Sequence, residues 1–182
     1  MSGPLAWLFW LVKNIAIMFA VMVFTNVILP QLMKALNPPQ IGTLVKPIRG
    51  LKFLKGRSFT IPDVESKRVT VLENWATWCG PCVRGIPHLT ELAKRYPDVS
   101  FVGVTQEQDE SVVQAFIDKM GDEMDYSVAV DPRGLTKEVV AASGGMGIPH
   151  AILMDAKGIM VWAGHPMDAK FEEAIQSALK AQ

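Results

Sequence analysis

The stretch that decides the fold is Trp75-Ala76-Thr77-Trp78-Cys79-Gly80-Pro81-Cys82, which carries both cysteines of the chain. Residues 69–76, rich in β-branched and aromatic side chains, predict a buried strand, whereas residues 82–94 predict a helix. The first cysteine therefore stands at a helix N-terminus, where the helix dipole and unpaired N–H groups stabilise a thiolate. We expect Cys79 to be a nucleophile with a lowered pKa.

This spacing also suits a reversible dithiol. Thiol-disulfide exchange needs a second thiol close to the first, and Cys82 lies within the first helical turn. Gly80 leaves the attacking sulfur uncovered, and Pro81 suits that turn because its missing N–H would be unpaired anyway. The alternative is half of a metal site, but the sequence holds no second Cys-x-x-Cys pair. We expect a redox-active disulfide, with no metal and no separate cofactor.

The motif resembles the thioredoxin superfamily, in particular its membrane-anchored TlpA/ResA-like branch. The resemblance extends to Pro87, at the place of the helix-kinking proline, and to Gly147-Ile148-Pro149, which is similar to the segment with the cis-proline. It covers the chain from Ile48 to its C-terminus. It implies an α/β thioredoxin fold, with a central mixed β-sheet flanked by helices, and a thiol-disulfide oxidoreductase.

The resemblance also assigns a role to Glu73. This residue precedes Cys79 by six positions, where thioredoxins carry a buried aspartate. A buried carboxylate without a positive partner has a raised pKa, so we expect Glu73 to take the proton from Cys82, through a water molecule. The alternative is a solvent-facing Glu73 on a shorter strand.

The resemblance further implies a surface for the substrate. In the family, the cis-proline faces the dithiol and the preceding backbone pairs with an extended substrate segment, here at Ile148 and Pro149. Trp78 then forms an apolar platform beside Gly80 and Pro81, although a plain core role is its alternative.

The N-terminal residues 7–29 are almost wholly apolar and end at Pro30. A helix that spans a bilayer needs about 20 apolar residues, so we interpret residues 1–36 as a transmembrane anchor. A cleaved signal peptide and an amphipathic surface helix are the alternatives. Pro38-Pro39 favours an extended linker over residues 37–47, followed by the redox domain at residues 48–182.

The charges exclude one class of partner and leave the membrane orientation open. Eighteen basic and eighteen acidic residues give no excess positive field for nucleic acid.

Basic residues stand on both sides of the span, Lys13 on one and Lys34, Lys46 and Arg49 on the other, so the positive-inside rule does not fix the orientation. The resemblance implies a single-pass protein of the cell membrane with an extracytoplasmic domain; a cytosolic domain is the alternative.

The remaining pattern predicts further elements in an α/β order. Edge strands are expected at 48–54 and 58–61, and further strands at 99–105 and 128–130. Helices are expected from 109 to 120, 135 to 142 and 168 to 179, with a hairpin of 151–155 and 159–163 before the last of them.

The expected function is the reduction of protein disulfides, because Gly80-Pro81 resembles the reducing members of the family. The expected partners are proteins with disulfides, a membrane electron donor and membrane lipid. A thiol peroxidase is one alternative, but such enzymes usually have threonine where this chain has Ala76. A copper-binding module is another, because His150 adjoins Pro149.

Overall fold

The computed structural model describes residues 3–36 and 38–181. The chain divides into two compact units, an N-terminal helical unit and a unit that covers Pro39–Gln182. The sheet and the dithiol belong to the second unit.

The N-terminal unit is one continuous helical rod of α1 (Pro4–Val23), a π-helical turn (Phe24–Ile28) and α2 (Leu29–Leu36). The Thr25 hydroxyl donates to the Val21 carbonyl at 2.8 Å, and the Asn26 amide donates to the Met22 carbonyl at 2.8 Å. Such back-bonding to the preceding turn competes with the regular helical ladder. Trp7–Leu32 forms a stretch of mean hydropathy 2.1, long and apolar enough to span a membrane.

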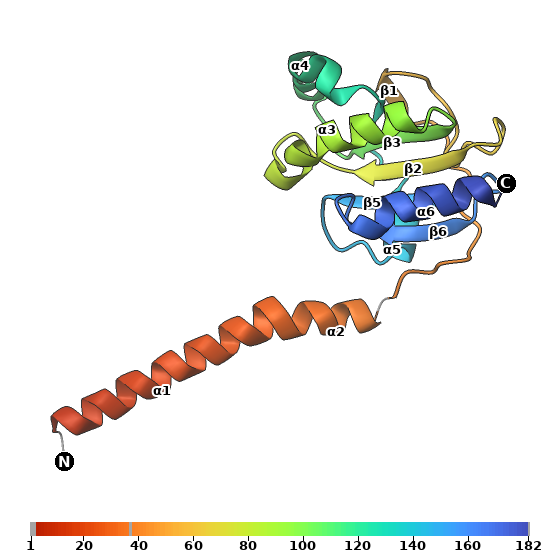
Figure 1. Ribbon diagram of the computed structural model, residues 1–182. Helices are drawn as coiled ribbons and strands as arrows, with labels where there is room; N and C mark the ends of the chain where they lie inside the picture. Colours follow the sequence, from red (N-terminus) through yellow and green to blue (C-terminus); the bar gives the residue numbers. More distant parts are fainter. Residues whose placement is uncertain (1–2, 37, 182) are drawn as a thin grey trace. The chain divides into compact units, whose positions relative to one another are not determined.

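The second unit is built on a six-stranded mixed sheet of order β1-β4-β3-β2-β5-β6 (Figure 1). The neighbours β2, β3 and β4 run parallel, whereas β1, β5 and β6 pair antiparallel with their neighbours. The strands are Lys52–Lys55, Val69–Asn74, Val99–Thr105, Ser127–Val130, His150–Met154 and Met160–Gly164. Every residue of β2 is buried, as a strand between two others should be.

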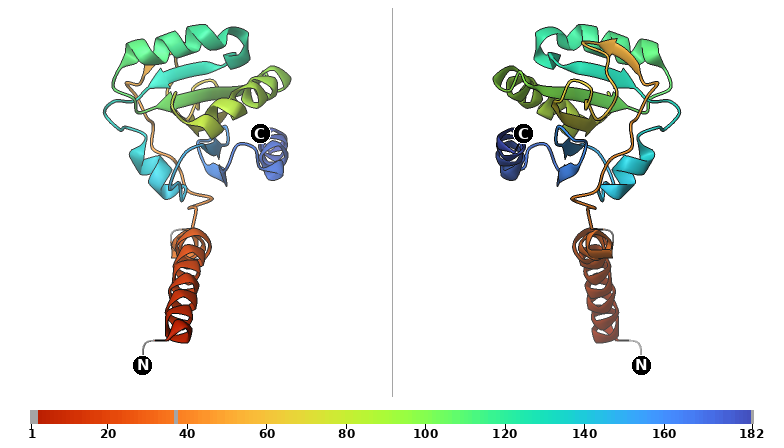
Figure 2. Two further views of the ribbon diagram at one scale, coloured as in Figure 1. Left: turned by 90° about the vertical axis from the view of Figure 1, so that its left-hand side faces the viewer. Right: turned by 90° about the vertical axis from the view of Figure 1, so that its right-hand side faces the viewer.

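Helices cover both faces of this sheet, and Figure 2 shows α5 and α6 on opposite sides of it. One face packs against apolar residues of α3, α4 and α6, and the other against α5 and the segment that precedes β1. These helices are Gly80–Arg95, Glu110–Met120, Lys137–Ala142 and Ala169–Lys180, in the order α3 to α6. This arrangement confirms the thioredoxin fold expected from the motif.

Two expected edge strands differ from the structure. Residues 58–61 form no strand in the part of the chain that the structure describes: only Ile61 bridges, to Ile48. Pro62 follows directly and has no N–H for a ladder. The strand expected at 48–54 is shorter, because Gly50 has φ 82° and interrupts the extended backbone before β1.

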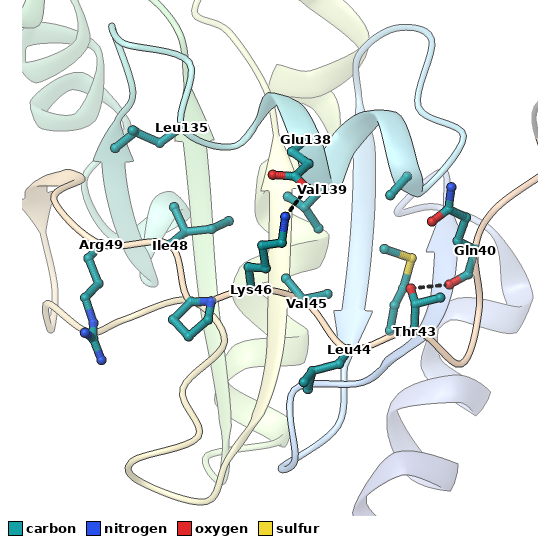
Figure 3. A pocket seen from close by; sticks show the side chains of 13 residues that line it. Gln40, Thr43, Leu44, Val45, Lys46, Ile48, Arg49, Leu135, Glu138 and Val139 are labelled. Carbon is teal, nitrogen blue, oxygen red and sulfur yellow. Dashed lines mark hydrogen bonds and ion pairs between the residues drawn. The ribbon is translucent and has the colours of Figure 1, made fainter.

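Residues 40–49, mostly within the stretch interpreted as a linker, pack along the domain. Leu44 bridges to Ile159, Val45 is buried, and Lys46 forms an ion pair of 2.8 Å with Glu138 on α5. Leu44, Val45, Lys46 and Glu138 line a cavity of about 460 Å³, and Figure 3 shows their side chains around it. The contacts of the packed unit thus extend N-terminally as far as Gln40, whose N–H donates to the Ala142 carbonyl.

Gly103 on β3 offers a test of packing beneath the dithiol. A Cβ atom there would lie 3.0 Å from Trp75 Nε1 and 3.1 Å from Tyr126 Cε2, tighter than ordinary contact. We expect Gly103→Ala to lower the free energy of unfolding by about 1–3 kcal/mol in urea denaturation, because buried rings must shift. Gly147→Ala is the control, since its Cβ would meet nothing within 4 Å. Equal stability of the two variants would contradict the prediction.

Candidate active site at the N-terminus of α3

The site begins where β2 leaves the sheet and α3 begins. Cys79 is the N-cap residue of α3, and its sulfur accepts a hydrogen bond of 3.2 Å from the Cys82 N–H. The two sulfurs are joined in a disulfide with an S–S distance of 2.04 Å. Pro81 stands in the first helical turn, as expected. After reduction, the same N–H would stabilise a Cys79 thiolate.

The two sulfurs differ in their access to solvent. Cys79 is 5 % exposed, and Cys82 is completely buried beneath it. Trp78, directly before Cys79, is 75 % exposed. A molecule that approaches from solvent therefore reaches Cys79 and the apolar ring beside it before it reaches Cys82.

Glu73 is buried on the side of the sheet that α3 covers. Side chains alternate along a strand, so Glu73 shares its face with Val71 and Trp75, which pack in one cluster with Cys82. Glu73 is only 1 % exposed, which excludes the solvent-facing alternative. Burial raises the pKa of Glu73 to about 8, although a hydrogen bond from Tyr126 opposes the shift.

The surroundings of Glu73 were not found from the sequence. Tyr126, 53 residues away, donates from its hydroxyl to Glu73 Oε2 at 3.4 Å, while Oε1 has no partner in the described structure. Gly103 pairs with Glu73 across the parallel strands and leaves room for the Tyr126 ring. Burial and the nearby carboxyl raise the pKa of Tyr126 well above 10.0, so the hydroxyl stays a donor.

The loop before β5 carries the expected cis-proline. The Ile148–Pro149 bond is cis, and so is Ile61–Pro62, which no sequence pattern indicated. His150, next in the chain, lies 2.7 Å from the Ser143 hydroxyl through Nε2, and burial lowers its pKa. His150 thus serves the packing of this loop. No three His, Cys, Asp or Glu side chains gather as a metal site would require within residues 3–36 and 38–181.

A cleft of about 620 Å³ lies beside the turn that precedes Cys79. Trp78 and Ile148, two of the expected substrate contacts, both line it. Its other walls come from the end of β2 and the turn after it, the end of β3 and the loop after it, α5, and the loop before β5: Asn74, Trp75, Ala76, Val104, Thr105, Gln106, Glu107, Gln108, Val140, Gly145, Met146 and Gly147. The cleft thus joins the turn directly before Cys79 to the residue directly before the cis-proline.

Comparison with known proteins finds relatives of the unit that carries the dithiol. The Redoxin family model matches residues 42–177. The chain is 33 % identical over 130 residues to the thiol-disulfide oxidoreductase ResA of Halalkalibacterium halodurans, a match that covers 69 % of this chain and 70 % of that protein. It is 31 % identical over 114 residues to the thioredoxin-like protein YneN of Bacillus subtilis, covering 60 % of this chain and 63 % of YneN.

Solved structures share the fold. StoA from Bacillus subtilis superposes with a TM-score of 0.55 at 23 % identity, covering 79 % of this chain and all of that one (100 %). The thioredoxin domain of a thiol-disulfide oxidoreductase from Bacteroides vulgatus gives a TM-score of 0.60 at 20 % identity, covering 78 % and 96 %.

The raised pKa of Glu73 predicts how stability depends on pH. An unfolded glutamate titrates near 4.5 and the folded one near 8. Below pH 4.5 both states hold the proton; as pH rises towards 8 only the unfolded state releases it, so stability falls over that range and levels off above. We expect Glu73→Gln, which does not titrate, to gain in melting temperature relative to the wild type between pH 4.5 and 8.

The measurement is thermal denaturation of both oxidised proteins from pH 4 to 9. Parallel curves for the two proteins would show that Glu73 titrates alike in the folded and unfolded states.

Proposed function

Because this chain belongs to the Redoxin family, we propose that it is a membrane-anchored thiol-disulfide oxidoreductase that reduces disulfides in extracytoplasmic proteins through Cys79 and Cys82. The observation that carries the proposal is the position of Cys79: it caps α3, it is the more accessible of the two sulfurs, and its partner cysteine lies beneath it. The names of ResA and of the other relatives support the oxidoreductase class.

The first step is the attack on a substrate disulfide. In the reduced protein, the Cys79 thiolate forms a bond with one substrate sulfur, and the second substrate sulfur leaves as a thiolate that takes a proton from solvent. The helix dipole and the Cys82 N–H favour the thiolate form of Cys79. The product is a mixed disulfide between Cys79 and the substrate.

The second step releases the substrate. Cys82 loses its proton, attacks Cys79 and displaces the remaining substrate sulfur as a thiolate, so that the substrate gains two electrons and the enzyme becomes a disulfide. Glu73 is the proposed base, because its pKa of about 8 lets it hold or release a proton near neutral pH. Glu73 lies on the sheet face that is covered by α3, the helix that carries Cys82. A dithiol electron donor in the membrane then restores the reduced enzyme.

The substrate is an extended protein segment that contains a disulfide. Its backbone pairs with Ile148 beside the cis-proline, in the manner of strand addition, and its apolar side chains contact Trp78. Gly80 and Pro81 leave the approach to Cys79 free of bulky side chains. The exposed Trp78 ring and the cleft support this placement.

The N-terminal helix is the proposed anchor. Trp7–Leu32 is long enough for one membrane crossing and carries one charged residue, Lys13, near its beginning. A lysine there can extend its ammonium group towards the headgroups. The family resemblance supports a redox domain on the extracytoplasmic side.

Reduction of insulin disulfides tests the activity. We expect the purified full-length protein, supplied with dithiothreitol, to accelerate insulin precipitation. Cys79→Ser should abolish the acceleration, because it removes the nucleophile, and Cys82→Ser should accumulate a mixed disulfide at Cys79. Glu73→Ala should accumulate the same species more weakly.

The other functions give different results in these assays. Fast peroxide consumption without insulin reduction would indicate a thiol peroxidase, and tight Cu(I) binding without turnover would indicate a copper-binding module. Either result would refute the proposal. A redox potential as high as that of disulfide-forming catalysts would refute its reductive direction.

Labelling in intact cells tests the anchor and its orientation. After mild reduction, a membrane-impermeant maleimide should modify Cys79 in spheroplasts that express the full chain, and the protein should sediment with membranes. A variant without residues 1–36 should remain soluble after cell lysis. Labelling only after permeabilisation would place the domain in the cytosol.

A further inference from the structure

Glu107, in the loop after β3, holds the turn that precedes Cys79. Its Oε1 accepts a hydrogen bond of 2.6 Å from the Thr77 hydroxyl, and its Oε2 accepts one of 2.9 Å from the Thr77 N–H. Oε2 also accepts a hydrogen bond of 2.9 Å from the Thr105 hydroxyl. Three donors thus converge on one carboxylate, and two of them belong to a single residue of the active-site turn, residues 76–78.

These bonds add to two backbone hydrogen bonds at the ends of the active-site turn, one to the sheet and one within the turn. At its start, the Trp75 N–H donates to the Val104 carbonyl at 3.2 Å. At its end, the Cys79 N–H donates to the Ala76 carbonyl at 3.1 Å. Thr77 stands between these two points, and its bonds to Glu107 tie it to the loop after β3. Trp78, next in the chain, is exposed and has little packing of its own to hold it.

Glu107 also belongs to the cleft beside the active-site turn. It lines this cleft together with Trp78 and Ile148, the residues expected to touch the substrate. Hydrogen bonds to an ionised acceptor are stronger and more directional than neutral ones. The carboxylate therefore fixes the distance between the loop after β3 and the turn that carries Trp78.

We propose that Glu107 is a positioning residue for the reduction of protein disulfides: it holds Thr77 so that Trp78 and the cleft are already arranged when a substrate segment arrives. This inference rests on the proposed oxidoreductase function. Preorganisation of a contact surface increases affinity because less conformational freedom is lost on binding. Loss of the Glu107–Thr77 contact should therefore raise KM for protein substrates.

The intrinsic reactivity of Cys79 depends on other contacts. Its sulfur accepts from the Cys82 N–H, and its carbonyl accepts from the Val83 N–H at 3.0 Å, both within α3. Neither contact involves Glu107. A small alkylating reagent, which does not need the cleft, should therefore react with Cys79 at the same rate and with the same pH midpoint in wild type and variants.

The experiment compares Glu107→Ala and Thr77→Val with the wild type, as full-length proteins in detergent. Insulin reduction at varied insulin concentration gives kcat and KM, and iodoacetamide alkylation from pH 4 to 9 gives the reactivity of Cys79. We expect kcat/KM for insulin to fall about tenfold, mainly through KM, with the alkylation profile unchanged.

Two further variants are the controls. Thr77→Ser keeps both donors to Glu107 and should retain most of the activity that Thr77→Val loses. Glu173→Gln removes the charge of an exposed glutamate on α6 and should behave as wild type. Thr77→Val replaces a hydroxyl by a methyl group of similar size, so it remains informative if Glu107→Ala does not fold.

Two results would overturn the inference. Thr77→Val removes the hydroxyl bond and keeps the N–H bond, whereas Glu107→Ala removes both. Unchanged insulin kinetics in Glu107→Ala, or in Thr77→Val if Glu107→Ala does not fold, would show that the contact positions nothing the substrate needs. Equal losses in insulin reduction and in alkylation would show a general effect on Cys79 or on the fold. A wild type that does not reduce insulin would refute the proposed function itself, and this inference with it.

Discussion

The site depends on one constraint, the fixed junction between a fully buried central strand and the helix that follows it. β2 is paired on both sides, with β3 in parallel and β5 antiparallel, so the point where the chain leaves the sheet cannot move without loss of ladder hydrogen bonds. Cys79 follows that point and caps α3. The sheet therefore supplies the rigidity, and the helix terminus supplies the electrostatic field that favours a thiolate at this sulfur.

The same central position explains the raised pKa of Glu73, the carboxyl group that we propose as the base. Glu73 stands among apolar neighbours, where an ionised group is unfavourable, and its pKa rises to about 8. Gly103, which has no side-chain carbon, leaves room for the Tyr126 ring, and the Tyr126 hydroxyl gives Glu73 one hydrogen bond. A second strong donor or a cation at Glu73 would lower the pKa and weaken the base. Burial of Glu73 thus has two effects. It destabilises the folded state, and it raises the pKa of Glu73 into the range that the proposed proton transfer needs.

The sequence predicted what depends on local pattern. The strand at 69–76, the helix after it and the hairpin before the last helix agree with the structure, because strand alternation and helix caps act over a few residues. Residues 58–61 looked like a strand by composition, but a strand also needs a partner with free ladder groups, and Pro62 offers no donor. Tyr126 and Glu107 were missed for a related reason. Each makes a hydrogen bond with a residue 30 or more positions away, Tyr126 with Glu73 and Glu107 with Thr77, and only the fold brings the two members of each pair together.

In the proposed function, the membrane anchor explains why weak contacts in the cleft are enough to bind a substrate. Among the residues that line the cleft, all in the described part of the chain, Glu107 is the one ionisable side chain, and its carboxylate already accepts three internal hydrogen bonds. In the proposed function, a substrate in the cleft would thus meet mainly apolar contacts at Trp78 and Met146, which are exposed, and would pair with the backbone at Ile148. Such contacts discriminate poorly between sequences. In the proposed function, an anchor in the same membrane as the substrate would raise the effective concentration of both, so that weak and general contacts would suffice.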